Sequence, residues 1–219
     1  MKKLSPKGTA RAFALIELIV IVLTLIVLAV TLACGLVRTQ RKASVIWCNN
    51  NLKQAGLAFR TWTVDLSTNW PTQVSTAFGG GKELVGSGQV FVHLRVMSNE
   101  LVTPKVLVCP ADKAKTAAQD FGPNFSDANV SYFVSIDANE NTPQMFLSGD
   151  RNLAFQGQPI KPGLFALTTN NPSISWTKAI HDSCGNVGLA DGSVQGFGRQ
   201  HLAEAVPYQG VATNRLAIP

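Results

Sequence analysis

The sequence lacks three patterns that would point to common functions. No two of its four cysteines stand in Cys-x-x-Cys spacing, which argues against a structural zinc site. No internal repeat and no low-complexity tract is visible, so a repeat architecture is not indicated. Basic patches interleaved with aromatic residues are also missing, and this weakens a nucleic-acid-binding interpretation.

The net charge of +6 does not indicate nucleic-acid binding either, because most of the excess of basic residues lies in the first 12 residues, here called the leader. Residues 1–12 hold four of the 19 basic residues and no acidic one, so the rest of the chain has 15 basic against 13 acidic residues. No nucleic-acid partner is expected from such a balance.

A long apolar segment follows the leader. Residues 13–37 contain a single acidic or basic side chain, that of Glu17. At ~1.5 Å rise per residue the segment exceeds a ~30 Å hydrocarbon core, and it is longer than the ~7–15-residue core of a secretory signal peptide. Four basic residues precede the segment and three follow it closely, which slightly favours a cytoplasmic N-terminus. The segment therefore predicts a single-pass transmembrane helix over 13–37.

Glu17 is the unusual residue of this span. An ionisable residue in hydrocarbon is costly and is by default functional, with a partner to be found. The alternative is an ordinary membrane anchor whose glutamate is protonated or reaches the interface. In a low-dielectric helix bundle a paired carboxylate would fix the axial register of neighbouring helices.

The segment Ala12-Phe13-Ala14-Leu15-Ile16-Glu17 resembles the type IV prepilin and pseudopilin signature, with Ala12 where glycine is usual. The resemblance implies that a prepilin peptidase cleaves between Ala12 and Phe13 and methylates the new amine of Phe13. Glu17 then becomes the fifth mature residue and neutralises the N-terminus of a neighbouring subunit during assembly.

The same resemblance implies partners and a location. The partners are the prepilin peptidase, other pilin-like subunits in a homo- or hetero-filament, and an inner-membrane assembly platform. The subunit would lie in the bacterial inner membrane, with its C-terminal domain in the periplasm or outside the cell. It would serve protein secretion in a type II secretion or type IV pilus-like system, as a structural subunit and not as an enzyme, with no resident cofactor.

The apolar periodicity continues beyond the span. Apolar residues recur at steps of three and four along one stripe, comprising Val45, Cys48, Leu52, Ala55, Phe59, Trp62 and Leu66. This predicts an amphipathic helix over 38–66 that continues the transmembrane helix without a break. The organisation expected is a cleaved leader (1–12), the span (13–37), this helix (38–66) and an exported domain (67–219).

We expect an α+β fold in which the long helix packs on an antiparallel sheet, as in pilins, with a C-terminal extension. Strand-forming composition occurs over Val130–Ile136 and Gln144–Leu147, and two runs flank Asp191-Gly192, which predicts a type I′ hairpin turn. The runs Gln89–Val96 and Lys105–Cys109 fit either a strand or a short buried helix, and the tail from residue 203 has little pattern.

Three blocks in the domain are similar to those of large pseudopilin-like families from planctomycete and verrucomicrobial genomes. They are the stretch Cys48–Phe59, the stretch Val108–Asp112, and His181 followed after nine residues by Asp191-Gly192. This His-x9-Asp-Gly element is associated in those families with prepilin-type processing.

The residues of these blocks allow several roles. His181 is expected to brace the Asp191-Gly192 turn by a hydrogen bond, although a Cys184–His181 nucleophile or a metal site is an alternative. Export would permit one disulfide, for which Cys48–Cys109 is the favoured pair because it would tie the helix to the domain.

Other ionisable residues give weaker signals. By analogy with pseudopilins, Asp137 and Asp150 could contribute to a calcium site, although no ligand spacing demands one. His93 and His201 have no partners nearby in the sequence and are expected to be ordinary surface or core residues.

Three other functions compete with the filament subunit. A membrane-anchored binding protein would use the helix only as a tether and would not polymerise. An exported hydrolase would use Cys184 and His181. A lipoprotein would be acylated at Cys34, where Thr31-Leu32-Ala33-Cys34 resembles a weak cleavage box.

Overall fold

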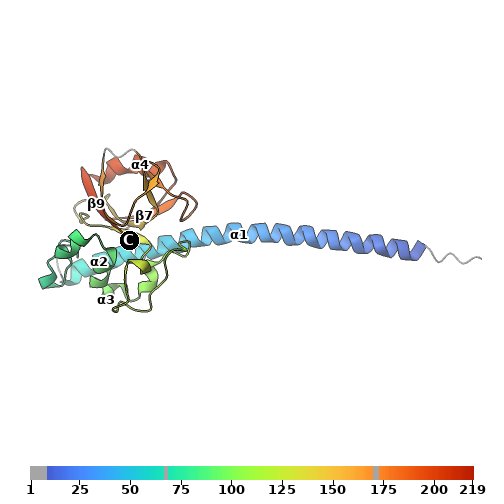
Figure 1. Cartoon of the computed structure of the whole chain (residues 1–219), viewed down its shortest axis with the longest axis horizontal. Coiled ribbons are helices and arrows are strands. Elements are labelled where there is room, and N and C mark those ends of the chain that lie inside the picture. The colour runs from blue at the N-terminus through green and yellow to red at the C-terminus, as the bar shows by residue number, and fades with distance from the viewer. Residues whose placement is uncertain (1–8, 67–68, 170–172) are drawn as a thin grey trace, which may run out of the picture. The chain divides into compact units, whose positions relative to one another are not determined.

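The computed structural model describes residues 9–66, 69–169 and 173–219 (Figure 1). The chain divides into two compact units, Met1–Ala43 and Ser44–Pro219. One helix, α1 (Thr9–Leu66), contributes to both units. The predicted α+β class is confirmed, because an N-terminal apolar helix is followed by a domain that contains antiparallel sheets.

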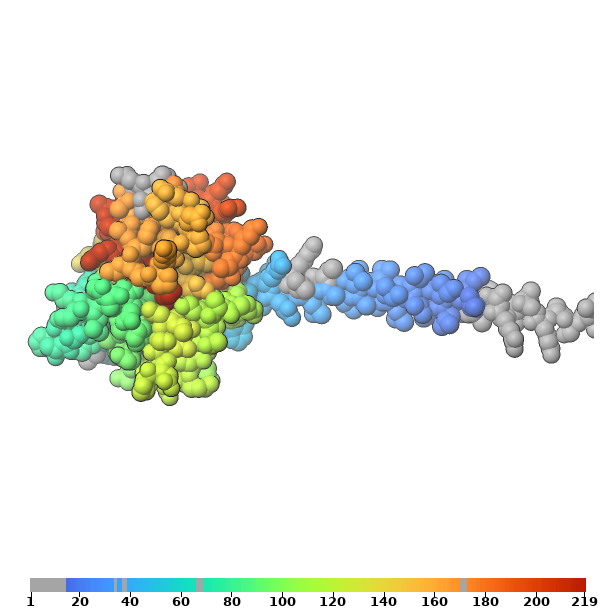
Figure 2. All heavy atoms as spheres, viewed as in Figure 1, coloured from blue at the N-terminus to red at the C-terminus, as the bar shows by residue number. Residues whose placement is uncertain are grey.

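The first unit is an exposed apolar helix. Its stretch Leu15–Ala33 has a mean hydropathy of 3.0 and no buried residue, and it is long and apolar enough to cross a membrane. In the segment that is blue in Figure 2, the side chains of Leu15, Leu23 and Leu32 are 55–60% exposed. So much exposed apolar surface requires an apolar partner, which makes this helix a candidate membrane anchor.

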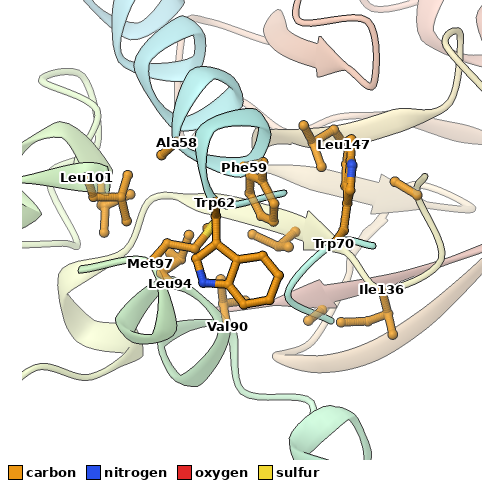
Figure 3. Close-up of a cluster of buried hydrophobic side chains, with 14 of the residues drawn as sticks. Ala58, Phe59, Trp62, Trp70, Val90, Leu94, Met97, Leu101, Ile136 and Leu147 are labelled. Carbon is orange, nitrogen blue, oxygen red and sulfur yellow. The ribbon is translucent and has the colours of Figure 1, made fainter. Parts of the chain in front are cut away.

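In the second unit, α1 buries one face, as the spacing of three and four residues predicts. Most of the predicted stripe is buried, namely Cys48, Leu52, Ala55, Phe59 and Trp62. Val45 is 37% exposed, so the covered stretch begins about one turn later than the stripe does. Figure 3 shows Phe59 and Trp62 among apolar side chains from other parts of the domain. Burial of this stripe attaches α1 to the rest of the unit.

The main sheet has six strands in the order β5-β9-β1-β2-β7-β8. All neighbouring pairs are antiparallel. The strands are β1 (Tyr132–Ser135), β2 (Phe146–Asp150), β5 (Gly163–Thr168), β7 (Gly185–Leu189), β8 (Val194–Phe197) and β9 (Thr213–Ile218).

A small sheet and several short helices complete the domain. The small antiparallel sheet consists of β3 (Leu153–Phe155), β4 (Gln158–Pro159) and β6 (Ile174–Trp176). The α-helices are α2 (Val90–Val96), α3 (Ser98–Leu101) and α4 (His201–Ala205). The 3-10 helices are η1 (Thr76–Phe78), η2 (Lys82–Ser87), η3 (Pro104–Leu107), η4 (Asp127–Asn129) and η5 (Val206–Gln209).

The main sheet has a hydrophobic core on each face. Two neighbouring residues of β1 belong to different clusters, because side chains along a strand point to opposite faces. Phe133 lies in the cluster that includes Trp176 of β6 and Leu202 of α4, whereas Val134 lies in the cluster with α1 and α2. Figure 1 shows α4 on one side of β7 and β9 and α2 with α3 on the other. The sheet is therefore the middle layer of the domain.

The ambiguous apolar runs turn out to be helical. All of the run Gln89–Val96 except Gln89 forms α2, and most of the run Lys105–Cys109 falls in or beside η3. The tail, in which the sequence showed little pattern, contains β9, which pairs with both β5 and β1. These pairings join segments far apart along the chain, so no local pattern signals them.

The Asp191-Gly192 hairpin is present between β7 and β8, but its turn differs from the predicted type I′. A type I′ turn needs positive φ at both central residues, whereas here only Gly192 has it, with φ of 86°. The amide of Gly192 donates to the carbonyl of Leu189, and the amide of Leu189 donates to the carbonyl of Ser193. The loop therefore contains three residues, with glycine at the left-handed position.

His93 provides a test of stability against pH. It lies on α2 with 0% exposure, and no described residue bonds to either ring nitrogen. Burial lowers its pKa from 6.5 to about 4. Between these pH values the unfolded chain takes up a proton that the folded chain does not, so the free energy of unfolding should fall by up to ~1.4 kcal/mol per pH unit as the pH drops.

His93→Leu is expected to flatten this slope. Urea unfolding of the full-length protein at several pH values between 6.5 and 4 measures it for both proteins. The exposed His201 supplies the control, since His201→Leu should leave the slope unchanged. An equally steep loss in His93→Leu would show that His93 does not cause it.

Candidate functional site

Four ionisable side chains from separate segments meet inside the second unit. They are Cys48, Cys109, Asp150 and His181, here called the Cys–His–Asp cluster, and their potential ligand atoms all lie within 4.8 Å of one another. The two cysteines and the aspartate are 0% exposed, and the imidazole side chain is 2% exposed. Such a concentration of ionisable groups in a buried place needs compensating partners.

Two members of the cluster belong to regular secondary structure, one to a helix and one to a strand. Cys48 belongs to the buried stripe of α1 and therefore faces the domain. Asp150 is the last residue of β2, opposite Tyr132 of β1 in the sheet register. The backbone amide of Asn186 on β7 and its side-chain Nδ2 both donate to Asp150 Oδ2, at 2.7 and 3.1 Å. The helix and the sheet thus fix a thiol and a carboxylate side by side.

Cys109 lies in the segment after η3, where a backbone turn and an ion pair fix its position. The amide of Asp112 donates to the carbonyl of Cys109 at 2.9 Å, which forms a tight turn. The Asp112 carboxylate accepts two hydrogen bonds from Arg151, at 2.7 and 2.9 Å. Because Arg151 follows Asp150 in the chain, this two-pronged ion pair ties the Cys109 turn to the end of β2.

His181 lies in the loop between β6 and β7 on unusual backbone. Three consecutive residues, His181, Asp182 and Ser183, have positive φ of 52°, 54° and 68°. This left-handed region is unfavourable for residues with a Cβ, and such strain persists only where the surroundings impose it. Asn152 Nδ2 lies within 3.0–3.3 Å of three carbonyl oxygens of this loop. The loop is thereby fixed with its imidazole in the cluster.

The four side chains interact directly. Cys109 Sγ lies 3.2 Å from His181 Nε2, which is 3.7 Å from Asp150 Oδ2. Cys48 Sγ donates to Asp150 Oδ1 at 2.9 Å. Asp150 is therefore the hub, with one oxygen directed to Asn186 and the other to Cys48.

These contacts determine the protonation states. A hydrogen bond with Cys48 and a second one with His181 lower the pKa of Cys109 to about 5, although burial opposes this. The same contact with Cys109, together with burial, raises the pKa of Cys48. Burial and the nearby Cys109 raise the pKa of Asp150 to about 6. Burial lowers the pKa of His181, but Cys109 and Asp150 outweigh it and the net shift is upward. The shifts of Cys109 and His181 both favour a thiolate at Cys109 paired with an imidazolium at His181.

A thiolate–imidazolium pair can act as a nucleophile or as part of a metal site. A nucleophile needs access to a substrate, whereas Cys109 is fully buried. Four donor atoms that converge from four segments, with no exposed member, resemble instead a closed structural ligand set. The geometry therefore favours binding of an ion over attack on a substrate.

The structure does not contain the expected Cys48–Cys109 disulfide. Both cysteines are free, although they lie together in the cluster, and each has a partner other than a sulfur bond. Cys48 donates to Asp150, and Cys109 contacts His181. The two residues do connect the helix to the domain, but through a polar cluster.

His181 does not brace the Asp191-Gly192 turn as expected. It belongs to the Cys–His–Asp cluster, and the turn is held by Arg60 of α1, whose Nη1 donates to the carbonyl of Asp191 at 2.7 Å. Gly192 lies close to Gly56 of α1, since a Cβ on Gly56 would stand 3.9 Å from the Gly192 Cα. The Asp-Gly end of the His-x9-Asp-Gly element thus contacts α1 directly, whereas His181 lies within 4.8 Å of Cys48 of α1 in the cluster.

Other residues singled out from the sequence lie apart from the cluster. Cys184 is exposed and free, and the sulfur that contacts His181 is that of Cys109. Asp137 forms an ion pair with Arg215, whereas Asp150 faces sulfur and imidazole, so the two do not form the suggested calcium site. Calcium prefers oxygen ligands, and the donor set around Asp150 does not suit it.

Glu17 lies in the first unit, in the exposed apolar part of α1. No residue that the structure describes pairs with its carboxylate, and the side chains of Ala12, Phe13 and Cys34 lie outside the described ones. The predicted cleavage and methylation at Ala12 and Phe13 and the lipoprotein alternative at Cys34 therefore stay predictions.

Three members of the cluster, Cys48, Cys109 and His181, lie in the blocks that resemble pseudopilin-like families, but the sequence predicted different roles for them. It missed the role of Asp150 as hub, because the only signal for it was a lone acid at the end of a strand. No family profile, no curated protein and no solved structure matches this chain.

Proposed function

We propose that the chain is a pilin-like subunit, that is, a pseudopilin or minor or major pilin of a type II secretion or type IV pilus-like system. Three features support this proposal. A basic leader ends in the signature Ala12–Glu17, an exposed apolar helix follows, and the continuation of that helix packs in a domain with an antiparallel sheet. A pilin-like architecture has this same order of parts.

The observation that carries the proposal is the position of Glu17. A carboxylate in an otherwise apolar exposed helix needs a cation in a low-dielectric environment. Cleavage after Ala12 would create an amine on Phe13, four residues before Glu17. The amine of one subunit would then pair with Glu17 of the next, which sets a fixed axial step between stacked helices.

The rest of the proposed mechanism is mechanical. A prepilin peptidase processes the subunit in the bacterial inner membrane, and an assembly platform stacks it with other pilin-like subunits. The apolar side chains of Leu15–Ala33 contact lipid before assembly and neighbouring helices afterwards. The domain stays on the periplasmic or extracellular side, where a growing filament moves cargo.

The N-terminus of protein extracted from native membranes tests the proposal. Mass spectrometry is expected to find a chain that begins at a methylated Phe13. Protein that still carries Met1 or Lys2 would contradict the proposal and favour a simple membrane anchor, and an acylated Cys34 at the N-terminus would show a lipoprotein.

A matched pair of variants at the cleavage site sharpens this test. Ala12→Gly restores the residue usual in the signature and should be processed at least as completely as the wild type. Ala12→Leu enlarges the same position and should accumulate the uncleaved chain. Equal processing of both variants would indicate a protease that does not read this site.

A further inference from the structure

We propose that the Cys–His–Asp cluster is a structural zinc site, in which Cys48, Cys109, Asp150 and His181 bind one ion. This goes beyond the proposed filament function, because it concerns what holds the domain to its helix. The donor set of two sulfurs, one imidazole nitrogen and one carboxylate oxygen matches the ligands that Zn²⁺ takes in proteins.

The distances fit a tetrahedral ion. Zinc bonds of ~2.0–2.3 Å place the ligand atoms ~3.3–3.8 Å apart. The corresponding contacts here are 2.9 Å from Cys48 Sγ to Asp150 Oδ1 and 3.2 Å from Cys109 Sγ to His181 Nε2. No pair of ligand atoms exceeds 4.8 Å, so closing around an ion requires shifts of about one ångström.

The proton balance also closes. Zinc binds cysteine as a thiolate and histidine through a neutral ring nitrogen, so any thiol proton of Cys48 or Cys109 and any second ring proton of His181 leave to solvent when the ion enters. No electron is transferred.

The surroundings hold the ligands in place, as the outer contacts of metal sites do. Asn186 fixes Oδ2 of Asp150 and leaves Oδ1 directed at the sulfur of Cys48. The ion pair of Asp112 with Arg151 holds the Cys109 turn, and Asn152 holds the strained loop of His181. All four positions belong to protein ligands and are buried, which is typical of a structural and not a catalytic zinc site.

Such a site would fasten α1 to the sheet. Cys48 comes from the helix, Asp150 from β2, and the other two ligands from the segment after η3 and the loop before β7. Zinc would bridge these segments, and the bound ion would stabilise the folded state by mass action. Removal of zinc with a chelator should therefore lower the Tm of the full-length protein.

The test uses the full-length protein purified in detergent under reducing conditions and stripped of metal. Addition of Co²⁺ should produce intense thiolate-to-cobalt charge-transfer absorption and the visible bands of a tetrahedral ion, saturating at one equivalent per chain. Zn²⁺ should displace the cobalt and abolish these bands. Cobalt absorption without the charge-transfer band would overturn the proposal.

Cys109→Ser and Cys184→Ser form a matched pair, since they make the same chemical change inside and outside the cluster. Cys109→Ser should weaken cobalt binding at least ~10-fold and diminish the charge-transfer band. Cys184→Ser should bind as the wild type does. Equal binding by the two variants, or a loss in Cys184→Ser alone, would overturn the proposal.

Thiol reactivity of the wild type provides a test that does not depend on the folding of a variant. In zinc-loaded protein a maleimide should label the exposed Cys184 but not Cys48 or Cys109, and a chelator should increase labelling of these two. Unchanged labelling after chelation, or a Cys48–Cys109 disulfide in native material, would overturn the proposal. None of these readouts depends on processing or assembly, so the zinc site and the filament function can fail separately.

Discussion

Glu17→Ala is expected to leave the subunit in the membrane but to stop it from entering filaments. Loss of a buried carboxylate–ammonium pair leaves the amine of a neighbouring subunit uncompensated, which costs ~3–5 kcal/mol for each contact. A cost of 3 kcal/mol corresponds to more than 100-fold in affinity. Because every contact in a filament repeats the same loss, assembly should fall below detection.

Filaments sheared from cells and collected by sedimentation measure this effect, with the membrane fraction as the reference for expression. Leu18→Ala is the control, since it truncates the neighbouring side chain of the same exposed helix without removing a charge. Glu17→Gln keeps the shape and removes the charge, and it should fail as the alanine variant does. A Glu17→Ala protein that sediments in filaments at the wild-type level would refute the pairing and favour a non-polymerising anchor.

Trp62→Ala should cause a large loss of stability in the domain. Trp62 is 0% exposed on α1 and lies in the core cluster formed with α2 and the sheet (Figure 3). No described residue accepts a hydrogen bond from its indole nitrogen, so its contribution comes from apolar burial and packing. Truncation of a buried tryptophan costs ~3–5 kcal/mol, because the cavity closes only in part.

Urea unfolding of the full-length protein in detergent, followed by near-ultraviolet circular dichroism, measures the loss. Val64→Ala is the matched control on the same helix, because Val64 is 84% exposed and its truncation should change stability by less than ~0.5 kcal/mol. A loss below ~1 kcal/mol in Trp62→Ala would mean that the helix is not held by this stripe.

Local patterns predicted the helix well. The stripe from Cys48 to Trp62 repeats every three or four residues, and this spacing alone determines which face of a helix is apolar. The hairpin at Asp191-Gly192 was also visible, but the exact loop was not. The carbonyl of Asp191 accepts from Arg60, a contact between distant residues that helps to fix the turn and leaves no trace in the local sequence.

Long-range pairing accounts for most of what the sequence did not predict. Strand β9 lies between Pro207 and Pro219 in a tail with little pattern, and it is stabilised by β5 and β1 on either side. The Cys–His–Asp cluster was equally hard to predict, because its four residues come from distant parts of the sequence. Cys48, Cys109 and His181 each attracted attention, but their convergence on Asp150 follows from the packing of α1 on the sheet and from the left-handed loop at His181.

The spread of the cluster along the chain has a consequence for biogenesis. Cys48 and Asp150 are 102 residues apart, and Cys109 and His181 are 72 residues apart. Closing loops of such length is slow, and no short fragment contains all four groups. During synthesis the set is therefore incomplete until residue 181 has emerged from the ribosome, so its assembly requires that the helix, the sheet and the loops have already come together.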